Sequence, residues 1–77
     1  MATDKDWQER VKGLLKAELK RKGVSYAQLA EKLMAMEIPE TERNISNKLS
    51  RGSFTAVFFV QCLTAIGTHT VRLHEAD

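Results

Sequence analysis

Four polar side chains are clustered in one short stretch of this sequence, at Arg43, Asn44, Asn47 and Arg51. Asparagine is a weak helix former, and a surface helix selected for stability alone would carry Glu, Lys, Gln or Ala instead. Arginine and asparagine are the side chains that make two-pronged hydrogen bonds to the edges of guanine and adenine. These residue types favour a surface that reads DNA bases, and a plain solvent-facing polar surface is the alternative.

A helix over residues 41–51 would position these polar side chains. Ile45 and Leu49 lie four residues apart and form an apolar stripe, while the Arg and Asn side chains lie toward the other side of the helix. Gly52 follows the last turn, where glycine commonly ends a helix. The stretch therefore predicts a helix that is buried on one side and polar on the other.

A second helix is predicted just before it, over residues 25–36, with Leu29, Leu33 and Met34 among the residues that face inward. Ser25 and Gln28 have the spacing of a capping box, which marks a helix start. Pro39 breaks the pattern, because its ring has no N–H to donate and disfavours helix in the preceding residue. Two helices joined by a break, the second with a polar outer face, are what a helix-turn-helix needs to read DNA.

The rest of the chain adds two helices and one strand to this pair. Asp6 is the expected N-cap of the first helix and Thr55 that of the last. The tail THTVRL alternates apolar with polar residues, which is typical of a short β-strand. The predicted elements within one domain spanning residues 1–77 are helices over 6–22, 25–36, 41–51 and 55–66 and a strand over 68–73. The expected fold class is an all-α helix-turn-helix domain of four to five helices with a short C-terminal β-strand.

Charge supports a nucleic-acid partner only in part. The formal net charge is +2, but residues 1–24 carry seven Lys and Arg against four Asp and Glu. Lys12, Lys16 and Lys20 line the outer face of the first predicted helix. They are either solvated charges that match the helix dipole or contacts to phosphate, which gain from counterion release.

The C-terminal part predicts a homodimer. Val57 and Val60 fall outside the core face of the last helix, so that helix is apolar over more than one side. The predicted strand has no partner strand in its own chain, and pairing with a second copy would satisfy its backbone. The expected dimer interface contains Val57, Val60, Val71 and Leu73.

Several segments resemble a known superfamily. SYAQLAEKL, NISNKLSRG and FFVQCLTAIG together resemble the phage-repressor-like (lambda-repressor-like) helix-turn-helix domains. KAELKRKGVSYAQLAEKL and NKLSRGSF look more closely like a small bacterial family known only as a domain of unknown function. The superfamily joins its paired helices by a shorter connection that contains glycine, whereas the AMEIP stretch here is longer and has none. Either the earlier helix runs one turn longer, or the turn is an expanded loop.

The resemblance also implies site residues. Arg43, Asn44 and Asn47 take the base-reading positions, and Ser25, Gln28 and Arg51 take positions that contact DNA phosphates. Lys48, beside Asn47 on the same predicted helix, is added to the phosphate contacts.

Other chemistries have little support in the sequence. Cys62, His69 and His74 lack the spacing of a zinc site, and Cys62 lies within an apolar helix without an activating base. No phosphate-binding loop, nucleophile motif or carboxylate pair points to an enzyme, and no cofactor or metal is expected. No secretory signal and no membrane span is evident, so we expect a cytoplasmic protein.

The sequence thus favours a dimeric, sequence-specific DNA-binding protein that acts as a small transcriptional regulator on double-stranded DNA. The alternative is a protein–protein interaction module that keeps the helix-turn-helix fold without binding DNA.

Overall fold

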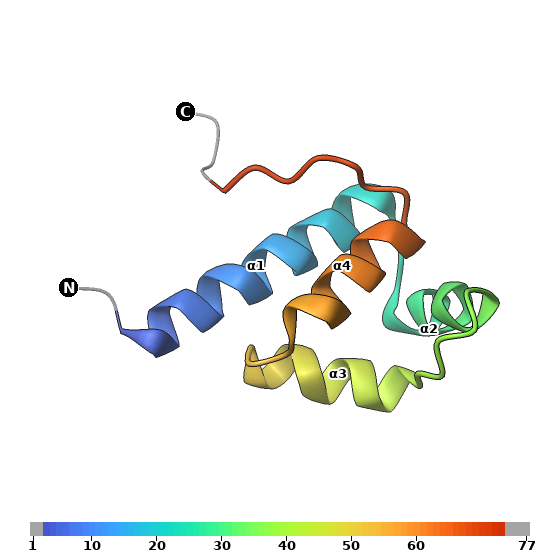
Figure 1. The fold of residues 1–77 in the computed structure, drawn as a ribbon, viewed down its shortest axis with the longest axis horizontal. Coiled ribbons are helices and arrows are strands. Elements are labelled where there is room, and N and C mark those ends of the chain that lie inside the picture. The colour runs from blue at the N-terminus through green and yellow to red at the C-terminus, as the bar shows by residue number, and fades with distance from the viewer. Residues whose placement is uncertain (1–2, 74–77) are drawn as a thin grey trace.

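Four helices make up the fold in the computed structural model, which describes residues 3–73. They are α1 (Asp4–Lys22), α2 (Tyr26–Ala35), α3 (Glu42–Arg51) and α4 (Ala56–Ala65). In Figure 1 the long helix α1 runs obliquely across the molecule, α3 lies below α4, and α2 is viewed nearly end-on. The predicted helical class is confirmed, and each predicted helix is present with ends that differ by at most two residues.

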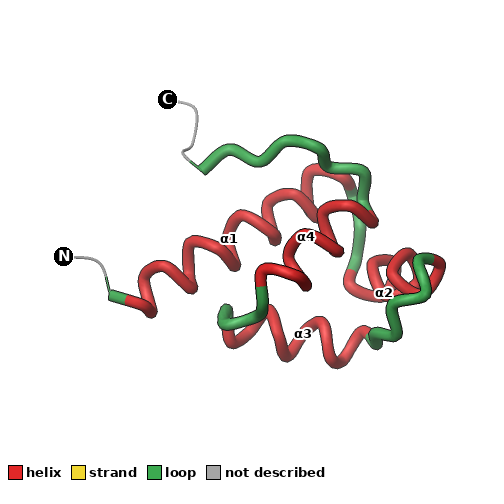
Figure 2. The backbone as a smooth tube through the Cα atoms, viewed as in Figure 1, coloured by secondary structure: helices red, strands yellow, loops and turns green. Residues whose placement is uncertain are grey.

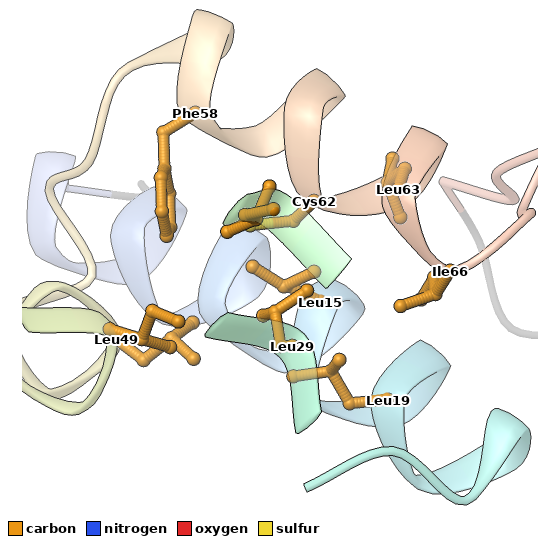
Figure 3. Packing of buried hydrophobic residues seen from close by; sticks show 10 residues of the cluster. Leu15, Leu19, Leu29, Leu49, Phe58, Cys62, Leu63 and Ile66 are labelled. Atoms are coloured by element: carbon orange, nitrogen blue, oxygen red, sulfur yellow. The ribbon is translucent and has the colours of Figure 1, made fainter. Parts of the chain in front are cut away.

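The core lies where the four helices meet, with α2 and α1 each packed against both α3 and α4. Every helix contributes buried apolar side chains to one continuous cluster (Figure 3). The cluster consists of Leu15, Leu19, Leu29, Leu33, Ile45, Leu49, Phe58, Cys62, Leu63 and Ile66. The apolar stripes read from the sequence therefore do face a common interior, except that Met34, expected inside, is exposed.

The helix starts follow the capping signals, with one correction. Ser25 and Gln28 form the predicted capping box, and Thr55 caps α4. The first helix begins earlier than expected, because Thr3 is its N-cap and Asp6 is the third helical residue that completes the capping box. A hydroxyl three residues before a carboxylate offers both hydrogen bonds of this motif, so Asp6 serves best inside the first turn.

The turn between α2 and α3 is an expanded loop and not an extension of α2. Glu37 adopts a left-handed conformation with φ of 62°. Its N–H donates to the Met34 carbonyl at 2.9 Å, and the Ile38 N–H donates to the Leu33 carbonyl at 2.9 Å. This is a Schellman ending of α2, in which glycine usually occupies the left-handed position.

Replacing Glu37 by glycine should therefore stabilise the domain. A left-handed conformation costs an L-residue about 1 kcal/mol that glycine avoids. We expect Glu37→Gly to raise the free energy of unfolding by about 1 kcal/mol in urea titration. The matched control is Glu31→Gly inside α2, where the same exchange should lower stability by about 1 kcal/mol. Equal effects of the two changes would contradict the left-handed turn.

The tail does not form the predicted strand, and residues 68–73 are an irregular segment beside α1 (Figure 2). A strand needs a neighbouring strand for its hydrogen bonds, and the described part of the chain offers none. The Thr68 hydroxyl instead donates to the Glu18 carboxylate at 3.1 Å. Hydrogen bonds from Arg21 and then from Thr68 hold the pKa of the Glu18 carboxyl below its ordinary value.

Candidate nucleic-acid interface

The outer face of α3 is the candidate interface. Arg43, Asn44, Asn47 and Arg51 are accessible to solvent on this face, while Ile45 and Leu49 on the other side are fully buried. Among residues 3–73, the side chains of these four polar residues make no hydrogen bond or ion pair, although the Asn44 backbone N–H donates to the Thr41 hydroxyl at 3.1 Å. The structure thus brings the predicted base-reading residues together on one accessible surface.

Two packing contacts hold α3 in place. Its buried face meets the buried leucines of α2 in the common core. The second contact is at the C-terminal end of α3. Gly52 adopts φ of 70° there, and a Cβ built on it would lie 3.0 Å from the Gln8 carbonyl oxygen of α1. Only glycine suits both this conformation and this close approach. The candidate interface is therefore carried on a helix that is fixed along its length.

Two of the predicted phosphate contacts, Ser25 and Gln28, are already used within the chain. The Ser25 hydroxyl accepts the Gln28 N–H at 3.1 Å, and the Gln28 side-chain oxygen accepts the Ser25 N–H at 2.9 Å. Both residues are exposed, and within residues 3–73 both side chains accept hydrogen bonds and donate none. Capping leaves them able to donate to an anion at the start of α2.

The Lys48 ammonium group is engaged by other residues of the domain. Its ammonium group forms an ion pair with Glu40 and lies 4.5 Å from the centre of the Phe58 ring. The Glu40 side chain is only 7% exposed, whereas that of Lys48 is 41% exposed. Sequence reasoning missed this pair, because the two residues are eight positions apart across a turn and follow no local spacing rule.

The residues expected at a dimer interface lie in two places. Val57 and Val60 are 66% and 58% exposed on α4. Val71 is half-buried against the core, and Leu73 is 67% exposed beside α1. A groove lies between α1 and the tail, and no residue of α4 lines it. The structure therefore separates the valines of α4 from the groove beside Val71 and Leu73.

Cys62 is fully buried in the core. Burial and the nearby negative charge of Glu40 raise the pKa of the Cys62 thiol to about 12. Such a thiol is protonated at neutral pH and is a poor nucleophile.

The remaining sequence features form no metal site among the described residues. His69 is exposed, and His74 falls outside the described residues. Within residues 3–73, no three His, Cys, Asp or Glu side chains gather as metal ligands would. No helix in this same range combines the length and apolarity needed to cross a lipid bilayer.

Comparison with known proteins gives one match. No curated protein and no solved structure matches the chain, and no finding supports membership of the phage-repressor-like superfamily that the sequence resembles. A family model matches residues 7–71, which span all four helices except the first turn of α1. The chain therefore belongs to the family described as Domain of unknown function (DUF6471).

Proposed function

We propose that this protein is a sequence-specific DNA-binding protein and acts as a small transcriptional regulator, with α3 as the helix that enters the major groove of double-stranded DNA. The observation that carries the proposal is the exposed α3 face of Arg43, Asn44 and Asn47. A major groove is wide enough for one helix, and it displays the donor and acceptor pattern that Arg and Asn match.

The spacing of these residues supports contacts to neighbouring base pairs. Arg43 and Asn47 are separated by about one helical turn, or about 6 Å along the axis. Successive base pairs are about 3.4 Å apart along the DNA axis, so the two side chains would span about two base pairs. The buried stripe of Ile45 and Leu49 keeps both side chains outward, and a fixed helix loses little entropy on docking.

Contacts to phosphates would come from the edges of this surface. Arg51 is exposed at the end of α3. The start of α2, capped by Ser25 and Gln28, offers backbone N–H groups to an anion. Lys16 and Lys20 on α1 are exposed and add positive potential. Lys48, in contrast, would have to leave Glu40 to reach a phosphate.

A protein-interaction module is the second candidate. The exposed methionines Met34 and Met36 at the end of α2 favour it, because flexible methionine side chains are common at protein-binding surfaces. Exposed Glu31 and Glu37 lie in the same segment and would repel DNA. This surface would bind an apolar, basic partner.

The test is a titration against random-sequence duplex DNA at several salt concentrations. A protein that contacts phosphates releases counterions, so its association constant falls steeply as salt rises. We expect a clear negative slope of log K against log salt. Absence of binding at low salt would reject the DNA-binding proposal and favour the interaction module.

The same titration with the Asn47→Ala variant tests whether Asn47 reads a base. It uses a DNA site selected from random sequences. Loss of a two-pronged contact should weaken binding by about 1–3 kcal/mol and relax the preference at one base pair. The matched control is Lys16→Ala, which should weaken binding to all sequences about equally. If Asn47→Ala also acted equally on all sequences, α3 would not be reading bases.

A further inference from the structure

The backbone of residues 69–72 has no hydrogen-bond partner within the described part of the chain. The Thr68 N–H donates to the Leu63 carbonyl at 2.9 Å and completes the end of α4. From His69 to Arg72, no main-chain N–H or carbonyl makes a hydrogen bond to any other residue in the range 3–73. Unpaired groups along an extended segment are a template for pairing with another strand.

The tail is nevertheless held in position at both ends. At its start, Lys22 donates to the Gly67 carbonyl at 3.5 Å and Thr68 donates to Glu18. At its end, an Arg10 guanidinium nitrogen donates to the Leu73 carbonyl at 2.6 Å. Between these contacts Val71 packs against the core. A segment fixed in this way loses little further entropy when a partner strand binds.

The contact with Arg10 identifies the open edge of the tail. In an extended segment the N–H and carbonyl of one residue point to the same edge, and successive residues alternate between edges. The Leu73 carbonyl accepts from Arg10 of α1, so with an extended backbone Val71 would share its edge. The backbone groups of Thr70 and Arg72 therefore point to the opposite edge, away from α1.

We propose that this edge pairs, in antiparallel orientation, with the same edge of the tail of a second copy of the chain. Centred on Val71, the pairing places Thr70 opposite Arg72 of the other copy, and His69 opposite Leu73. No like charges face each other in this register, whereas centring on Arg72 would place two arginines together. Thr70 and Arg72 of both copies then supply the main-chain hydrogen bonds across the two-fold axis, a form of β-strand addition.

The groove between α1 and the tail lies on the side of the tail opposite the proposed pairing edge. It has a volume of about 760 Å³ and is lined by Gly13, Leu14 and Ala17 of α1 and by Val71 of the tail, among others. A Cβ built on Gly13 meets no atom within 4 Å, so the space above this part of α1 is open. Directly opposed strand residues lie on one face of a sheet, so Leu73 of the second copy would lie on the same face as Val71 but across the tail from this groove, which the second copy would leave open.

This pairing deepens the proposed DNA-binding function, since a two-fold dimer would present two α3 helices to half-sites about 34–36 Å apart. The pairing itself does not depend on DNA. Dimerisation is measured without DNA, and DNA binding is measured by the salt titration, so either can fail while the other holds.

The experiment is sedimentation equilibrium of the full chain at tens of micromolar. We expect a mass near twice the 8.7 kDa of one chain. Thr70→Pro removes one main-chain donor from each copy and should weaken dimerisation about tenfold to a hundredfold. Thr70 is exposed and outside the helices, so circular dichroism should show unchanged helix content.

Two controls accompany this variant. Thr70→Val keeps the backbone N–H and should dimerise like the natural chain. A Val57→Ser/Val60→Ser double variant alters the exposed face of α4 and should also dimerise normally. A mass near 8.7 kDa for the natural chain, equal dimerisation of Thr70→Pro and Thr70→Val, or loss of the dimer in the α4 variant would each overturn the proposal.

Discussion

Ile45→Ala is expected to destabilise the domain by about 2–5 kcal/mol, the range found when a large buried side chain is cut back to alanine. Ile45 is 0% exposed and lies where α3 meets the core. A chain of this size has about 4–12 kcal/mol of stability in total. The change should therefore remove a large share of it, and urea unfolding followed by circular dichroism would measure the loss.

Leu63→Ala on α4 should lower the free energy of unfolding by an amount in the same range. Leu63 packs into the same core cluster as Ile45, but from α4. Val60→Ala is the matched control, since Val60 lies on the same helix but faces outward. It should change stability by less than about 0.5 kcal/mol. A loss below about 0.5 kcal/mol for Ile45→Ala would show that α3 is not anchored through its apolar stripe.

The fold was largely predictable where the sequence repeats with a helical period. Leu29 and Leu33, and likewise Ile45 and Leu49, are four residues apart, and burial of one predicts burial of the other. Capping residues marked the helix starts, because a Ser or Thr hydroxyl satisfies backbone N–H groups that helices leave free. Met34 was misplaced, since it follows Leu33 at the edge of the stripe and lies next to the last residue of the helix.

Contacts between distant parts of the chain could not be predicted in this way. The tail was expected to be a strand because its residues alternate, yet alternation says nothing about the presence of a neighbouring strand. Glu37 at a left-handed position was equally hidden, because glycine is the usual signal there. The conformations of the tail and of Glu37 depend on how the helices pack, and not on the conformational preferences of the residues themselves.

The candidate interface was predicted in part. Exposure of Arg43, Asn44 and Asn47 follows from the position of Ile45 and Leu49 on the same helix. Lys48, beside Asn47 on the same helix, was assigned to the DNA phosphates. In the structure Lys48 forms an ion pair with Glu40, and only the three-dimensional course of the turn brings these two residues together.

Lys48→Met should destabilise the domain by about 3 kcal/mol, because it leaves the Glu40 carboxylate buried without its cation. One Glu40 oxygen already has no hydrogen-bond partner among the described residues, and the other accepts from Lys48. The change also removes the ammonium group from the Phe58 ring. Lys48 itself is partly exposed, so water entering its place would keep the loss at the lower end of the range of about 3–5 kcal/mol that is typical of broken buried pairs.

A double-mutant cycle separates the buried charge from the loss of packing. Methionine has a volume close to that of either residue, so Glu40→Met combined with Lys48→Met removes both charges while filling the space. Replacing a whole buried pair by apolar side chains is often close to neutral. We therefore expect the double variant to be more stable than Lys48→Met alone by about 2 kcal/mol or more. Lys32→Met, an exposed lysine on α2, is the control and should be nearly neutral. Strict additivity of the two single changes would show that the ion pair does not couple the turn to α3.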